Sequence, residues 1–128
     1  MIYLDTSFLI SWLIKDDLHH KKALDIVGEI QEDVFVTLDV LKEFLTVVTY
    51  KSSSEAALAL FDIIYSGKFV QIVQETSEGF EETIETHRSL RYHKFSYVDC
   101  SLIAVARTMQ CKVLTFDKEL GKAVESLR

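Results

Sequence analysis

Short apolar runs alternate along the chain with longer stretches in which apolar residues recur every three or four positions. An uninterrupted run of a few apolar residues is typical of a buried strand, and the longer period is typical of a helix. Strands are therefore predicted over residues 2–4, 34–37, 69–73 and 112–116. Helices are predicted over residues 8–14, 18–31, 41–50, 54–65, 77–90, 97–109 and 118–127. Helix 54–65 is expected to bury the stripe Ala57, Leu58, Phe61 and Ile64 or Tyr65.

Helical connections between short, wholly apolar strands predict an α/β fold in which helices cover both faces of a parallel sheet. Right-handed crossovers place the carboxyl end of every parallel strand at the same edge of the sheet. Ligands of open α/β sheets bind at that edge. Polar residues that directly follow the strands are therefore the first candidates for a functional site.

The length of 128 residues, 48% of them hydrophobic, fits one domain with its own core. The chain contains no proline and only four glycines, so no segment is typical of a linker, and a single domain is predicted over residues 1–128. Asp5 interrupts the first apolar run, which argues against a signal peptide, and no apolar run approaches the ~20 residues that span a bilayer. We therefore expect a soluble, cytoplasmic protein with no membrane contact.

The net charge of −6 argues against a nucleic-acid partner, but the charges are unevenly distributed. Residues 71–87 carry five acids and no lysine or arginine, whereas residues 88–116 carry five lysines or arginines and a single acid, Asp99. This isolated carboxylate lies among apolar residues of a predicted helix. Asp99 is therefore a candidate functional residue.

Three further acids fall at the carboxyl edge of the predicted sheet. Asp5 directly follows the first strand and Asp117 the last, while Glu43 lies in the first turns of the helix after the second strand. Each acid also has a local explanation: Asp5 and Asp117 can cap helices, Ser96 and Asp99 match a capping box, and Glu43 can be solvated. Asp39, which lies near them, suits the N-cap of its helix.

Together, the four acids predict a site for a hard divalent cation. Like charges gathered at one edge raise one another's pKa values unless a cation neutralises them. Mg²⁺ and Mn²⁺ prefer carboxylate oxygen and leave coordination positions for a phosphate group. Ions held in this way can activate water and stabilise the departing oxygen of a phosphodiester.

The segments "IYLDTSFL", "VLKEFL", "FSYVDCSLIAVA" and "KVLTFDKEL" resemble, in this order, the PIN-domain family and its small VapC-type ribonucleases. The resemblance covers the whole chain. It implies an α/β/α sandwich with a central parallel sheet of four to five short strands. It also implies a Mg²⁺- or Mn²⁺-dependent endoribonuclease that cleaves single-stranded RNA. On its pattern the catalytic and metal-binding residues are Asp5, Glu43, Asp99 and Asp117, with the hydroxyls of Thr6 and Thr115 supporting them.

The resemblance further implies the toxin of a type II toxin-antitoxin pair, a homodimer and a cognate antitoxin protein. From the residues themselves, "RSLRYHKFSY" adds a possible RNA-binding stretch in which Arg88, Arg91 and Lys94 follow phosphates and an aromatic ring stacks on a base. An ordinary solvated helix end with buried aromatics is the alternative reading of this segment.

Two alternative functions stay open: a PIN nuclease of RNA maturation or flap cleavage, and a non-catalytic PIN-fold module that binds proteins. Other classes are excluded by their motifs. Receiver domains need an acid pair after the first strand and haloacid-dehalogenase phosphatases need DxD, but Thr6 and Ser7 follow Asp5. The phosphate-binding loops GxxxxGK and GxGxxG are absent from the sequence.

Overall fold

The strands and helices follow the predicted order along the chain. The computed structural model describes residues 1–127. Its strands are β1 (Ile2–Leu4), β2 (Val34–Thr37), β3 (Val70–Val73) and β4 (Lys112–Leu114). Its helices are α1 (Thr6–Leu13), α2 (His20–Glu29), α3 (Leu38–Lys51), α4 (Ser54–Ser66), α5 (Ser77–Ser89), α6 (Tyr97–Met109) and α7 (Lys118–Leu127). The predicted α/β class is confirmed.

The four strands form one parallel sheet in the order β3-β2-β1-β4. Leu4 pairs with Leu114 in the register of β1 and β4. The pairing continues past the strand ends, because the backbone N–H of Asp5 donates to the carbonyl of Leu114 at 3.0 Å. The residues that follow β1 and β4 are thereby placed side by side at the carboxyl edge.

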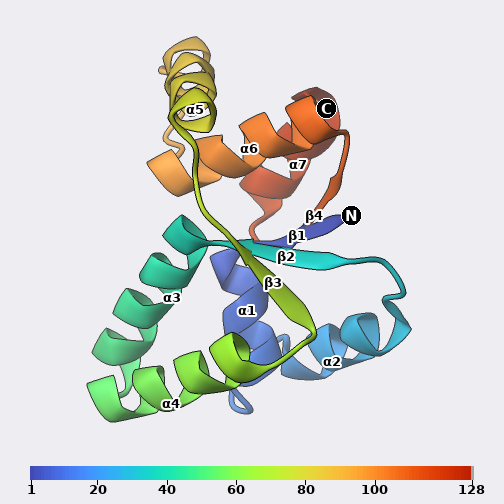
Figure 1. The fold of residues 1–128 in the computed structure, drawn as a ribbon, viewed down its shortest axis with the longest axis vertical. Helices are drawn as coiled ribbons and strands as arrows, with labels where there is room; N and C mark the ends of the chain where they lie inside the picture. Colours follow the sequence, from blue (N-terminus) through green and yellow to red (C-terminus); the bar gives the residue numbers. More distant parts are fainter. Residues whose placement is uncertain (128) are drawn as a thin grey trace.

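Helices cover both faces of the sheet (Figure 1). Helices α1 to α4 lie on one face and α5 to α7 on the other, so the predicted α/β/α sandwich is confirmed. None of the helices in residues 1–127 is long and apolar enough to cross a bilayer.

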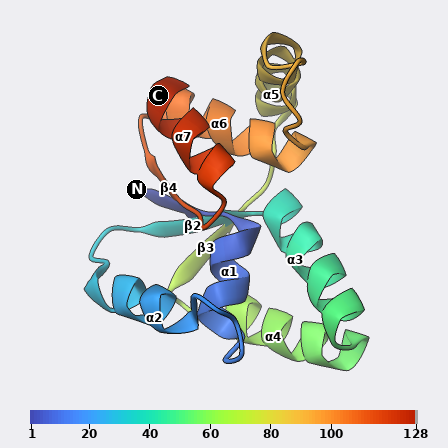
Figure 2. The same ribbon diagram turned by 180° about the vertical axis from the view of Figure 1, so that it is seen from behind.

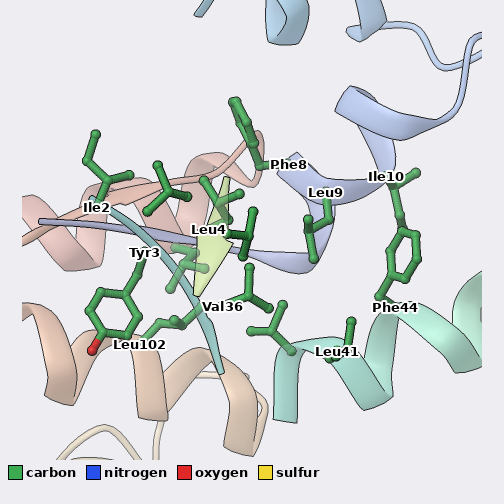
Figure 3. Packing of buried hydrophobic residues seen from close by; sticks show 14 of the residues in the cluster. Ile2, Tyr3, Leu4, Phe8, Leu9, Ile10, Val36, Leu41, Phe44 and Leu102 are labelled. Atoms are coloured by element: carbon green, nitrogen blue, oxygen red, sulfur yellow. The ribbon is translucent and has the colours of Figure 1, made fainter. Parts of the chain in front are cut away.

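The core lies on both faces of the sheet, against α1 and α3 on one face and against α6 and α7 on the other. Figure 3 shows Leu9 of α1, Phe44 of α3 and Leu102 of α6 among its residues. Leu4 of β1 and Val36 of β2 are fully buried, and they face Leu9 of α1 and Phe44 of α3, which are fully buried as well. The first strand and the start of α1 are therefore fixed by packing, which positions Asp5 between them.

The predicted stripe of α4 is only partly correct. Ala57 and Ile64 are buried, but Leu58 is 56% exposed and Tyr65 is 65% exposed. Helix α4 lies at the periphery of its layer and contacts α3 and β3. Phe61 is half-buried against the core, as predicted, whereas Leu58 and Tyr65 face outward.

Candidate active site

The four predicted acids lie at the carboxyl edge of the sheet, each on a different segment. Asp5 occupies the N-cap position of α1, Glu43 lies in the second turn of α3, Asp99 in the first turn of α6, and Asp117 directly precedes α7. The beginnings of α1, α3, α6 and α7 surround this end of the sheet (Figure 2). Asp5 is buried, Glu43 and Asp99 are half-buried, and Asp117 is exposed.

The charges of these acids act on one another. Burial raises the pKa of Glu43, the charges of Asp5 and Asp99 raise it further, and the nearby Thr6 hydroxyl lowers it in part. Burial likewise raises the pKa of Asp99, hydrogen bonds from Ser96 oppose this, and the charges of Asp5 and Asp117 add to it. The topology therefore gathers the four acids into one electrostatic cluster.

Hydroxyl groups hold the Asp5 carboxylate. Its Oδ2 accepts hydrogen bonds from Ser7 Oγ and from Thr115 Oγ1, each at 2.8 Å. Ser7 Oγ also accepts the backbone N–H of Phe116 at 3.0 Å, and Thr115 Oγ1 accepts that of Asp117 at 3.0 Å. The Asp5 side chain makes no cap hydrogen bond to α1, so the alternative that it serves as a helix cap is wrong.

Ser7 is a site residue that the sequence reasoning did not single out. Its hydroxyl joins the segment after β1 to the segment after β4, since it contacts Asp5, Thr115 and Phe116. The signal was present in the sequence as the third residue of "DTS". Its partners Thr115 and Phe116 are more than a hundred positions away, which local patterns do not reveal.

Two of the acids also cap helices. Ser96 and Asp99 form the predicted capping box, with the Ser96 N–H donating to Asp99 Oδ2 at 3.0 Å. Asp117 Oδ1 accepts the N–H groups of Glu119 and Leu120 at the start of α7. A carboxylate can therefore cap a helix and belong to the acidic cluster at the same time.

Asp39 is not the N-cap of α3. The helix begins directly after β2, so Thr37 occupies the cap position and its Oγ1 accepts the N–H of Val40 at 3.1 Å. Asp39 lies in the first turn instead, with Lys42 Nζ at 3.9 Å.

The donor atoms of the cluster fit a hard divalent cation. Asp5, Asp99 and Asp117 each use one carboxylate oxygen in the hydrogen bonds described above, and within residues 1–127 the second oxygen of each makes none. No lysine, arginine or histidine in this range forms an ion pair with any of the four acids. The buried Thr6 Oγ1 lies near Glu43 but makes no hydrogen bond of ordinary length and angle within these residues. Carboxylate and hydroxyl oxygen atoms that make no hydrogen bond or ion pair are available as ligands, and oxygen is the ligand atom that Mg²⁺ and Mn²⁺ prefer.

The acids are nevertheless not gathered as tightly as ligands around an ion. No three His, Cys, Asp or Glu side chains of residues 1–127 are arranged so that they could hold a metal ion in their present positions. Mutual repulsion between carboxylates opposes a closer approach. Binding of an ion would therefore have to draw these side chains together.

The three basic residues of the predicted RNA-binding stretch make no polar contact with the acidic cluster within the described residues. Arg88 Nε lies 3.5 Å from Glu85 Oε1, and Arg91 donates to the carbonyl of Arg88 and lies over the ring of Tyr92. Lys94 is exposed in the loop that leads to α6. No hydrogen bond or ion pair within residues 1–127 joins Arg88, Arg91 or Lys94 to the four acids.

The cost of burying Glu43 leads to a testable prediction about stability. Because its pKa is raised in the folded protein, ionised Glu43 destabilises the fold above that pKa, and the penalty vanishes below the ordinary glutamate pKa of about 4.3. Glu43→Gln is expected to raise the Tm of the metal-free protein at pH 7 by about 2–4 °C, with the gain disappearing as the pH falls towards 4. Thermal unfolding in EDTA between pH 4 and 8 measures this.

Glu81→Gln is the matched control, because Glu81 is exposed on α5. It is expected to leave the Tm unchanged across the same pH range. A Glu43→Gln variant that is equally stable or less stable than the wild type at pH 7 would show that the Glu43 carboxylate is well solvated in solution.

Known proteins resemble this chain along nearly its whole length. A model of the PIN domain family matches residues 2–125. VapC20 of Mycobacterium tuberculosis, a toxin that cleaves the sarcin-ricin loop, has a TM-score of 0.86 at 23% identity, covering 96% of this chain and 95% of that one. No curated protein sequence matches the chain.

Two solved complexes are also similar. VapBC2 of Rickettsia felis, bound to a DNA fragment from its promoter, gives a TM-score of 0.71 at 17% identity, covering 96% of this chain and 93% of that one. FitAcB of Neisseria gonorrhoeae gives a TM-score of 0.72 at 18% identity, and the match covers 98% of this chain and 94% of that one. At these identities the likeness establishes a shared fold.

Proposed function

The chain belongs to the PIN-domain family, and on this basis we propose that it is a divalent-metal-dependent endoribonuclease that hydrolyses phosphodiester bonds in single-stranded RNA. The observation that carries the proposal is the electrostatic coupling of the four acids, which involves Asp5, Glu43, Asp99 and Asp117. Structural caps alone would not require a buried aspartate held by two hydroxyls beside three other acids.

The same four acids are the residues proposed to hold Mg²⁺ or Mn²⁺. A bound divalent ion activates water and neutralises the charge that develops on the phosphate during hydrolysis. Ser7 and Thr115 orient the Asp5 carboxylate through their hydrogen bonds to Oδ2. In the metal-free protein burial raises the pKa of Glu43, so a cation that neutralises its charge stabilises this carboxylate.

The wider biological role is part of the proposal. We propose that residues 1–128 form a single nuclease domain of VapC type, that it is the toxin of a toxin-antitoxin pair, and that it forms a homodimer blocked by an antitoxin protein. The support is the similarity in fold to VapC20 and to the VapBC2 and FitAcB complexes. Arg88, Arg91 and Lys94 remain predicted RNA contacts.

Cleavage of defined oligonucleotides tests the activity directly. The purified chain is incubated with end-labelled single-stranded RNA, duplex RNA, single-stranded DNA and a flap substrate, with Mn²⁺, Mg²⁺ or EDTA. Internal cleavage of the single-stranded RNA in Mn²⁺ or Mg²⁺, and none in EDTA, is the expected result. Cleavage confined to the flap would favour the flap-nuclease alternative, and absence of cleavage on all substrates would favour a protein-binding module.

A further inference from the structure

A basic hollow lies beside the acidic cluster, on the side of Asp117. Its volume is about 380 Å³, and Asp117 lines it. The start of α2, the segment after β4 and α7 also contribute to its lining, through His19, Lys22, Phe116, Lys118 and Lys122. The hollow thus shares a carboxylate with the proposed site of cleavage.

The rings of His19 and Phe116 line this hollow, and they continue a stack of three rings that begins at Phe8 in the core. The rings of Phe8 and Phe116 are parallel within 6° at a centroid distance of 5.4 Å, and those of Phe116 and His19 within 7° at 4.5 Å. Phe8 is buried in the core, whereas His19 is exposed at the outer end of the stack. A flat ring fixed on a rigid base and open to solvent is a suitable platform for a nucleobase.

The backbone around His19 is held in place. Asp17 Oδ2 accepts the N–H of His19 at 2.9 Å and the hydroxyl of Ser11 in α1 at 2.7 Å. The carbonyl of His19 accepts the N–H of Ala23 at 2.9 Å. Because both ends of the residue are bonded, the ring is positioned before any ligand arrives.

Three exposed lysines surround this platform. Lys22, Lys118 and Lys122 form no ion pair within residues 1–127. In a chain with a net charge of −6, three lysines and a single carboxylate, Asp117, give this hollow a positive balance. Their ammonium groups are suited to the phosphates on either side of a stacked base.

We propose that this hollow is a nucleotide-binding subsite for single-stranded RNA, in which a base stacks on His19 and the flanking phosphates contact Lys22, Lys118 and Lys122. The strand then continues past Asp117 to the acidic cluster. The inference rests on the proposed function, because it takes RNA as the ligand, but it concerns binding and can be tested without cleavage.

The test measures the Kd of the full chain for a fluorescent single-stranded RNA in EDTA, by anisotropy over a range of salt concentrations. His19→Ala is expected to weaken binding by about five- to tenfold, and His19→Phe to restore it, because a phenyl ring also stacks. With an oligonucleotide that lacks bases, His19→Ala and wild type are expected to bind equally. Unchanged Tm values show that the variants are folded.

The triple variant K22Q/K118Q/K122Q tests the binding of phosphates by the lysines. The slope of log K against log salt is expected to fall by about 1.4 to 2, because each phosphate neutralised on a single strand contributes roughly 0.7 to the slope and the three lysines reach two or three phosphates. The matched control, K42Q/K51Q/K68Q, removes the same charge from exposed lysines outside the hollow and is expected to keep the wild-type slope.

The outcomes separate the subsite from the nuclease activity. If RNA is cleaved in Mn²⁺ but neither variant changes binding, the subsite is wrong and the proposed function stands. If both variants weaken binding but no RNA is cleaved, the subsite stands and the proposed activity is wrong. A wild-type chain that binds no single-stranded RNA overturns the subsite.

Discussion

Replacing Asp5 by asparagine is expected to lower the rate of RNA cleavage by at least about 10²- to 10³-fold while the fold is preserved. This is the typical cost of removing one preorganised electrostatic group from an active site. Asp5 is buried and belongs to the acidic cluster, so an uncharged amide there removes a proposed metal ligand and a charge that acts on Glu43 and Asp99. Single-turnover cleavage in Mn²⁺, with Tm as a check on folding, measures the effect.

Asp39→Asn is the matched control for this loss. It also removes one carboxylate near the same edge of the sheet, but Asp39 is half-buried and pairs with the exposed Lys42, and its charge does not act on Glu43 or Asp99. Its variant is expected to cleave at the wild-type rate. Equal activities of the Asp5→Asn and wild-type chains would contradict the proposed role of Asp5.

Removing the hydroxyl of Thr115 tests the same carboxylate, Asp5, and is expected to cause a smaller loss of cleavage. Thr115→Val removes a hydrogen bond to Asp5 and is expected to cost about 10- to 100-fold, the typical cost of losing a group that orients a metal ligand. Thr115→Ser keeps the hydroxyl and is expected to retain most of the activity. If valine and serine are equally active, the hydrogen bond does not serve catalysis.

The strands were the easiest elements to predict, because each is a short run of mostly apolar residues, although only β1 is buried along its whole length. β1 and β2 have the predicted boundaries, while β4 ends at Leu114, two residues earlier than expected. The outward-facing side chains of α4 were not predictable in this way. Helical period identifies an apolar stripe, but how much of it is covered depends on where the helix lies in its layer, as Leu58 and Tyr65 demonstrate.

The edge at which the acids lie could be inferred from topology, because right-handed parallel connections fix the carboxyl ends of the strands. The hydrogen-bond partners of the acids could not be inferred in this way. Local capping rules assign Asp5 to α1, but its side chain bonds to Thr115, which is 110 positions away. Capping rules also predicted Asp39 as the N-cap of α3, whereas Thr37 is the cap, because α3 begins directly at the end of β2 and strand ends are poorly defined by sequence.

A metal ion that binds only the folded chain must stabilise it. At a Mn²⁺ concentration of 100 times Kd the expected gain is about 2.7 kcal/mol, or roughly 10 °C in Tm for a domain of this length. Asp99→Asn is expected to abolish this gain. In EDTA the same variant is expected to be at least as stable as the wild type at pH 7, because burial raises the pKa of Asp99 and its ionised form is unfavourable there.

The choice of asparagine separates the two roles of Asp99. Its amide oxygen can still accept the N–H of Ser96, so the capping box that Asp99 completes is retained while the negative charge is lost. If Asp99 is only a cap, the variant should respond to Mn²⁺ as the wild type does. Asp62→Asn, on the distant helix α4, is expected to keep the full response. A full Mn²⁺ response in Asp99→Asn would therefore remove Asp99 from the proposed metal site without any appeal to cleavage.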